Sequence, residues 1–122
     1  MNLQSLEMVR TAVAALREKK GKDIVALDVS EKTVLADAFI IVTGTNDRQV
    51  TALTDAVDEA LGKAGFEKKN VEGYHTGKWI LLDFGDLIVH VFDPESRAFY
   101  DLERIWRDAE RIDLPEEGPA RA

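Results

Sequence analysis

Two short apolar runs, residues 78–84 and 87–92, flank the pair Gly85-Asp86, and this feature constrains the fold more than any other. A two-residue loop that begins with glycine is typical of a tight β-hairpin turn. The pairing that this turn sets is Phe84 with Leu87, Leu82 with Val89, and Ile80 with Val91. Directly opposed residues share one face of a sheet, so the sequence predicts a hairpin with two distinguishable faces.

The two faces of the predicted hairpin differ in chemistry. One is wholly apolar and is expected to lie in the core: Ile80, Leu82, Phe84, Leu87, Val89 and Val91. The other carries Trp79, Leu81, Asp83, Ile88, His90 and Phe92. Asp83 and His90 are diagonal neighbours there, within reach of each other. This face is therefore either a half-covered surface with a satisfied Asp–His pair or a binding patch, since tryptophan beside charged groups is typical of interfaces.

Three segments have the period of amphipathic helices. Apolar residues recur three or four apart from Leu3 to Leu16 and again from Val50 to Leu61. Residues 44–47 offer caps for the second of these helices, and Gly65 is expected to end it. A third helix begins at Asp93-Pro94, a typical N-cap and first-turn pair, and its apolar period continues to Ala109.

The remaining segments are predicted strands, at residues 24–29, 38–43 and 66–71 in addition to the hairpin. Residues 38–43 are rich in β-branched side chains and apolar on both faces, so this strand is expected in the middle of the sheet. The order is helix, two strands, helix, three strands, helix. It predicts an α/β (α+β) sandwich, with a mixed five-stranded sheet and flanking helices.

Composition limits the class of protein further. A chain of 122 residues, 45% of them hydrophobic, suits one core, so we expect a single domain over residues 1–114 and a flexible tail over 115–122. The absence of cysteine excludes a disulfide scaffold and any cysteine-based nucleophile or metal site. The apolar runs are far shorter than the roughly 20 residues of a membrane span, and the N-terminus does not resemble a signal peptide. We expect a cytoplasmic domain without membrane contact.

The net charge of −7 is concentrated at one end of the sequence. Residues 1–80 carry 11 basic and 12 acidic groups, whereas residues 81–118 carry four arginines against 11 acidic groups. An acidic surface repels nucleic-acid phosphates and attracts basic partners, so direct binding of nucleic acid is not expected.

The usual sequence patterns of catalytic sites are absent. The chain has no GxxxxGK[ST], GxSxG or HExxH motif. His75 and His90 lack metal-ligand spacing and would hold zinc with Asp83 only by a coincidence of folding, so neither metal nor cofactor is expected. Gly44-Thr45 lies between a strand and a helix, where it could bind phosphate, although such turns more often serve as simple helix caps. The chain is therefore not expected to be an enzyme.

Longer stretches of the sequence resemble the Iojap family, also called the ribosomal silencing factors (RsfS). The resemblance covers roughly residues 3–108 in the family order. The matching stretches are Ala26-Leu27-Asp28-Val29, Asp37 to Thr45, Arg48-Gln49-Val50, Val71-Glu72-Gly73, Trp79 to Phe92, Arg97, Tyr100-Asp101-Leu102-Glu103 and Trp106.

The resemblance implies a fold similar to the nucleotidyltransferases, without their activity. Those enzymes place two carboxylates on a strand after a Gly-Ser or Gly-Gly turn to hold two Mg²⁺. Here Gly44-Thr45 is followed by a helix and by residues 66–69, without an Asp-x-Asp strand, and Asp83 and Asp86 span a turn. The alternative left open is a metal-dependent nucleotidyl transferase or hydrolase that uses Asp83, Asp86 and His90.

The resemblance also implies a partner. Members of the family bind the large ribosomal subunit through its ribosomal protein fourteen, block joining of the small subunit, and repress translation when nutrients are short. Some form homodimers, and Trp79 and Phe92 on an open sheet face would suit self-association. We expect the ribosomal contact on the hairpin face and its borders, at Glu72, Trp79, Asp83, Asp86, His90, Tyr100, Asp101 and Glu103.

Overall fold

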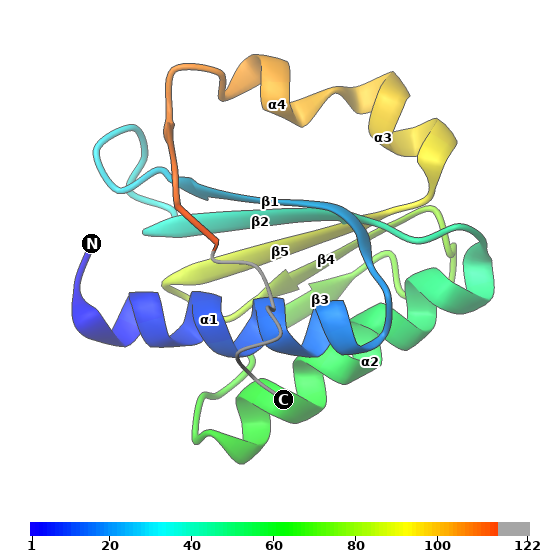
Figure 1. The fold of residues 1–122 in the computed structure, drawn as a ribbon, viewed down its shortest axis with the longest axis horizontal. Helices are drawn as coiled ribbons and strands as arrows, with labels where there is room; N and C mark the ends of the chain where they lie inside the picture. Colours follow the sequence, from blue (N-terminus) through cyan, green and yellow to red (C-terminus); the bar gives the residue numbers. More distant parts are fainter. Residues whose placement is uncertain (115–122) are drawn as a thin grey trace, which may run out of the picture.

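The computed structural model describes residues 1–114 as a six-stranded mixed sheet with helices on both faces (Figure 1). The elements in chain order are α1 (Leu3–Glu18), β1 (Lys22–Asp28), β2 (Ala38–Thr43), α2 (Asp47–Lys63), β3 (Asn70–Glu72), β4 (Trp79–Asp83), β5 (Leu87–Phe92), α3 (Pro94–Tyr100), α4 (Leu102–Ile105) and β6 (Glu110–Arg111). The tail predicted at 115–122 lies outside the described residues. No helix of residues 1–114 is long and apolar enough to cross a membrane.

The sheet has the strand order β3-β4-β5-β2-β1-β6. β2 and β5 run parallel to each other at its centre, and the other neighbouring strands are antiparallel. All six residues of β2 are buried, which confirms the central position expected from its unbroken apolar run.

The hairpin forms with the predicted register. Leu82 pairs with Val89, Ile80 pairs with Val91, and the Phe84 N–H donates to the Leu87 carbonyl. The apolar face of the hairpin packs into the main core with α1 and α2, and Leu82 is almost fully buried there. We call this side of the sheet the inner face and the opposite side, toward α3 and α4, the outer face (Figure 1).

Side-chain caps fix where the helices begin. The Asn2 side chain accepts from the Ser5 N–H at α1, Asn46 accepts from the Gln49 N–H at α2, and Asp93 accepts from the Ser96 N–H at α3. Each cap satisfies a backbone donor that the helix itself cannot pair. The predicted Asp93-Pro94 start is confirmed.

The sheet differs from the prediction at both edges. A sixth strand, β6, pairs with β1 through only two residues, a length that carries no detectable pattern of its own. The strand predicted at 66–71 is β3, shifted to Asn70–Glu72. The shift arises because the Phe66 N–H is used to close α2, by donating to the Leu61 carbonyl.

The helices also differ from the prediction in two places. Leu3, predicted on the buried stripe of α1, is 84% exposed because it lies in the first turn, at the end of the core. The single helix predicted from Asp93 to Ala109 is broken into α3 and α4 at Asp101, whose φ of 50° is left-handed. Neither short helix contains a buried residue. We call residues 94–105 the arm.

Candidate functional site

The outer face carries a continuous row of aromatic rings. Tyr100 of the arm packs on Trp79 at 4.6 Å between ring centroids, and Trp79 lies 6.0 Å from His90. His90 contacts Phe39 at 5.2 Å, and Phe39 contacts Trp106 at 5.0 Å. Three of the five rings lie on strands, and the other two, Tyr100 and Trp106, join the row because the chain folds back over the outer face. Offset and edge-on contacts of this kind stabilise aromatic packing beyond the area that it buries.

His90 is the buried member of this row and does not form part of an open surface. Its Nδ1 accepts a hydrogen bond from the Trp79 indole N–H at 3.2 Å, and only 5% of the residue is exposed. Burial lowers the pKa of His90 to about 4, so the ring is neutral at pH 7. Because Nδ1 accepts, the ring proton lies on Nε2, which is buried without a hydrogen-bond partner. The prediction that His90 contacts a partner directly does not fit this burial.

The Asp83–His90 pair, one of the two alternatives for this face, does not form. The Asp83 carboxylate accepts from the Gly85 N–H at 2.8 Å and so stabilises the hairpin turn. Gly85 has a φ of +86°, a conformation that suits glycine and confirms the tight turn. Trp79 takes the place beside the imidazole that the sequence assigned to the carboxylate.

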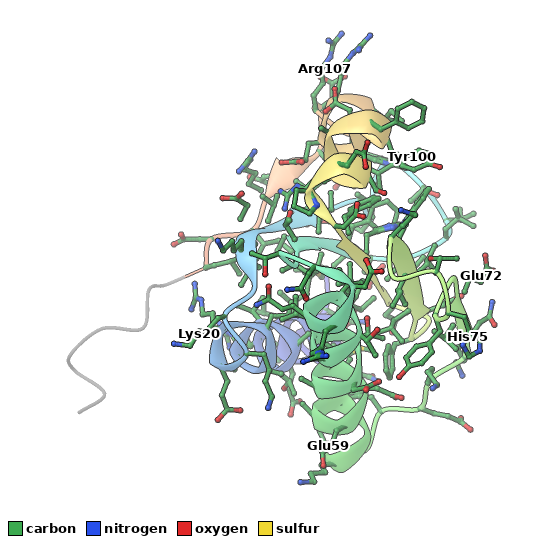
Figure 2. All side chains as sticks on the ribbon, turned by 90° about the vertical axis from the view of Figure 1, so that its right-hand side faces the viewer. Lys20, Glu59, Glu72, His75, Tyr100 and Arg107 are labelled. Carbon is green, nitrogen blue, oxygen red and sulfur yellow. The ribbon has the colours of Figure 1, made fainter. Side chains whose placement is uncertain are left out.

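On the outer face, the arm does not cover the part of the sheet formed by β3 and the adjoining side of β4. Acidic and apolar side chains lie together there. Glu72 is directly opposite Leu81, and Asn70 is opposite Asp83, so all four side chains share the outer face. Glu72 is exposed, and its carboxylate accepts from the Asn70 side-chain amide. Figure 2 shows Glu72 and Tyr100 on the same side of the molecule. We define the open edge as Glu72, Trp79, Leu81, Asp83 and Tyr100.

The arm is attached to the sheet through Arg97. Its guanidinium forms two hydrogen bonds of 3.1 Å with the Glu103 carboxylate, and it also donates to the Thr43 hydroxyl and to the Asp23 carbonyl. Glu103 is therefore engaged within the chain, which leaves less of its carboxylate for a partner. Asp101 is the bend between α3 and α4.

The predicted residues thus fall into separate groups. Glu72, Trp79, Asp83 and Tyr100 lie at the open edge, Asp101 and Glu103 lie on the arm above it, and His90 lies below. Asp86 is exposed at the hairpin turn, the far end of a strand about 20 Å long. Any single contact surface that includes Asp86 must extend along the whole hairpin.

Sequence reasoning missed several exposed apolar side chains near the outer face. Val34 is fully exposed, Leu35 is 68% exposed, and Phe99 and Ile105 on the arm are 78% and 69% exposed. The sequence does contain one indication of them. Val34 and Leu35 are adjacent aliphatic residues in a polar turn, outside any strand or helix period that would bury them.

Binding of anions or metals finds little support in the geometry. The Gly44-Thr45 turn serves as a helix start, where Asn46 caps α2 and the Thr45 N–H donates to the Gln49 side chain. A shallow hollow there is lined by three carboxylates, those of Asp47, Asp93 and Glu95, against one cation, Arg48, a balance that disfavours phosphate. Within residues 1–114, no group of three or more His, Cys, Asp or Glu side chains is placed to hold a metal ion. Asp83, Asp86 and His90 are not brought together as the catalytic alternative requires.

Comparison with known proteins gives consistent results. Residues 2–122 match the family model described as "Ribosomal silencing factor during starvation". The chain is 37% identical over 112 residues to the ribosomal silencing factor RsfS of Halalkalibacterium halodurans, covering 92% of this chain and 96% of that protein. A crystal structure of a Chromobacterium violaceum protein has a TM-score of 0.83 and 39% identity, covering 99% of this chain and 98% of the other.

A more distant relative bears a different name. It is the mouse protein called mitochondrial assembly of ribosomal large subunit protein 1, which is 28% identical over 97 residues. The match covers 77% of this chain and 42% of the mouse protein.

Proposed function

Because this chain belongs to the ribosomal silencing factor (RsfS) family, we propose that it binds the large ribosomal subunit and blocks joining of the small subunit. It acts by occupying a surface and without turnover, and the result is repression of translation when nutrients are short. Its contact on the subunit is ribosomal protein fourteen. The word "starvation" in the family description and the large ribosomal subunit in the mouse relative's name support this proposal.

The observation that carries the proposal is the composition of the open edge. Two carboxylates, those of Glu72 and Asp83, lie beside the partly buried Trp79 and Leu81 and the exposed ring of Tyr100. Aromatic anchors with a charged rim are typical of protein interfaces, and carboxylates select a basic partner such as a ribosomal protein. Little reorganisation is needed because the rings are already packed against one another.

Co-sedimentation with separated ribosomal subunits tests the proposal. The protein is expected to pellet with large subunits and, when added first, to prevent them from joining small subunits. Pelleting with small subunits alone, or binding without any effect on joining, contradicts it.

A charge variant tests the assignment of the open edge. Glu72→Lys combined with Asp83→Asn is expected to weaken binding at least tenfold, because it places positive charge against a basic partner. The asparagine retains an oxygen that accepts from the Gly85 N–H. The matched control is Glu59→Lys with Asp58→Asn on α2, which changes the net charge equally on the opposite side of the sheet (Figure 2). Equal weakening in both variants moves the contact away from the open edge.

Incubation with nucleotides and Mg²⁺ or Mn²⁺ tests the catalytic alternative. We expect no product above a blank. Turnover that is lost in Asp83→Asn contradicts a purely steric mechanism and favours a metal-dependent transferase or hydrolase.

We also propose that the exposed apolar residues of the arm and the open edge allow the chain to form a homodimer. Phe92, expected on this surface, is fully buried, so the apolar area left exposed in the single chain is that of Phe99 and Ile105, beside the partly exposed Tyr100. Sedimentation equilibrium of the parent and of Phe99→Ser combined with Ile105→Ser is expected to show weaker self-association in the variant. An unchanged association constant removes the arm from the dimer contact.

A further inference from the structure

The loop between β1 and β2, residues 29–37, presents two adjacent aliphatic side chains to solvent. Val34 is fully exposed and Leu35 is 68% exposed, whereas the flanking Val29 and Ala36 are buried in the outer-face core. Single exposed apolar residues are common on protein surfaces and need no explanation, whereas contiguous exposed apolar surface marks contact sites.

This loop is ordered by its own hydrogen bonds. The Val29 N–H donates to the Asp37 carbonyl and so closes the base of the loop, and the Lys32 and Thr33 N–H groups donate to the Val29 carbonyl. Near the tip, the Leu35 N–H donates to the Thr33 hydroxyl. The tip is therefore held in one conformation without any contact made by the Val34 side chain.

Side chains at the base add to this order. The Ser30 hydroxyl and N–H both donate to the Asp28 carboxylate, and these bonds lower the pKa of Asp28 below its ordinary value. The Ser5 hydroxyl of α1 donates to the Asp37 carboxylate at 2.8 Å. A loop that is already ordered loses little conformational entropy when a partner binds it.

The loop is joined to the end of the hairpin. The Asp86 carbonyl accepts from the N–H groups of Asp37 and Ala38, at 2.9 and 3.1 Å. In Figure 2 the loop, seen in pale cyan, reaches toward the side on which Glu72 and Tyr100 are labelled. The loop thus lies at the hairpin end of β4, next to Asp83, whereas Trp79 and Tyr100 of the open edge lie at the other end.

Charge around the loop resembles that of the open edge. The ionisable residues of the loop, its base and the hairpin turn are Asp28, Glu31, Lys32, Asp37, Lys69, Asp83 and Asp86. Five are acidic and two are basic. A partner that meets this end of the sheet therefore benefits from positive charge around an apolar centre.

We propose that Val34 and Leu35 form a second apolar anchor for the basic ribosomal protein, at the opposite end of the hairpin from Trp79. This inference rests on the proposed function, because the partner is the same. Asp83 and Asp86 lie between the two anchors. Their carboxylates would meet the basic partner there, which gives the acidic hairpin turn a role although it is far from the arm. An isolated apolar contact on a mobile loop would cost ordering entropy, and the hydrogen bonds above remove most of that cost.

The test is the double variant Val34→Ser with Leu35→Ser, measured by co-sedimentation with large subunits and by thermal unfolding. Binding is expected to weaken at least tenfold, equivalent to about 1.4 kcal/mol, with the unfolding temperature unchanged because neither side chain supports the core. The control is Leu3→Ser, which removes a leucine that is 84% exposed, against 68% for Leu35, from the first turn of α1 on the inner-face side. It is expected to bind as the parent does.

The possible outcomes separate a failure of this inference from a failure of the proposed function. Parental binding by the loop variant overturns this inference while the proposed function stands, provided that the parent pellets with large subunits. Failure of the parent to pellet overturns the proposed function and this inference together. Equal weakening by Leu3→Ser shows a general effect of lost apolar surface and rejects the loop as a specific anchor. A loop variant that changes only the self-association of the protein, and not its binding to large subunits, rejects it as well.

Discussion

The inner and outer faces of the sheet are built from the same strands yet differ in how they are covered. The inner face is covered by α1 and α2, of 16 and 17 residues, and the buried residues of its core are mostly aliphatic, with Phe84 as the buried ring and Phe66 and Tyr74 only partly buried at its border. The outer face is covered by an arm of two short helices that contain no buried residue. Its core is smaller, richer in aromatic rings, and includes a buried histidine with an unpartnered nitrogen.

This difference separates stability from binding. Large continuous burial on the inner face supplies most of the hydrophobic stabilisation. The outer face leaves Trp79, Tyr100 and the open edge partly in water, where a partner can bury them. A surface that binds a partner keeps part of its apolar area exposed in the free chain.

The largest expected effect comes from placing a charge on one face or the other of β4. Leu82→Asp buries an unpaired carboxylate in the inner core and is expected to cost about 4 kcal/mol or more, enough to unfold a marginally stable domain. Leu81→Asp changes the neighbouring residue on the half-open outer face and is expected to cost about 1 kcal/mol. Circular dichroism during thermal unfolding measures both, and equal losses would contradict the asymmetry between the faces.

The next effect depends on pH and on the outer face alone. Between pH 6.5 and about 4 the unfolded chain binds a proton at His90 that the folded chain excludes, because burial has lowered the pKa of His90 to about 4. The free energy of unfolding should therefore fall as pH falls through this window, by up to about 3 kcal/mol.

His90→Phe isolates this contribution, since the carboxyl groups titrate in both proteins. Urea unfolding at several pH values is expected to show the two curves separating below pH 6.5 and running parallel below pH 4. Parallel curves throughout would place His90 in water and contradict its burial.

A smaller, local effect is expected from releasing the arm. Arg97→Ala removes the bonds to Glu103, Thr43 and the Asp23 carbonyl, a loss on the order of 1.5 kcal/mol. Hydrogen exchange should quicken in residues 94–105 and remain slow in α1 and α2. Equal acceleration in both regions would show that the arm is as integral to the core as the long helices.

The smallest effect concerns salt. Binding to large subunits should weaken a few-fold as salt rises from 0.1 M, because the Debye length shortens from about 10 Å to about 3 Å at 1 M. The loss stays partial since apolar contacts of Trp79 persist. Unfolding stability, which depends on the inner core, should change little over the same range. Binding that strengthens steadily with salt would identify a purely apolar contact.

Much of the fold could be predicted because its patterns are local. The Gly85-Asp86 turn sets the hairpin register within a few residues, and the strand period of two then assigns every side chain to a face. The same holds for the caps at Asn46 and Asp93, whose partners lie three residues away. The candidate site was predicted less well. Trp79 and Asp83 share the outer face of the hairpin, with Glu72 at its border and Asp86 at the turn as predicted, whereas His90, predicted on the same open face, is covered.

The sequence by itself determined the inner face, since periods of 2 and 3.6 residues specify which side chains must be buried together. Only the tertiary structure decided how the outer face is closed. The helical period continues through Asp101, but the chain bends there because Arg97 pairs with Glu103 and Tyr100 packs on Trp79. Contacts such as Phe39 with Trp106 join residues far apart in the chain. The energies of such contacts depend on which residues are close in space, and a local hydrophobic period does not contain that information.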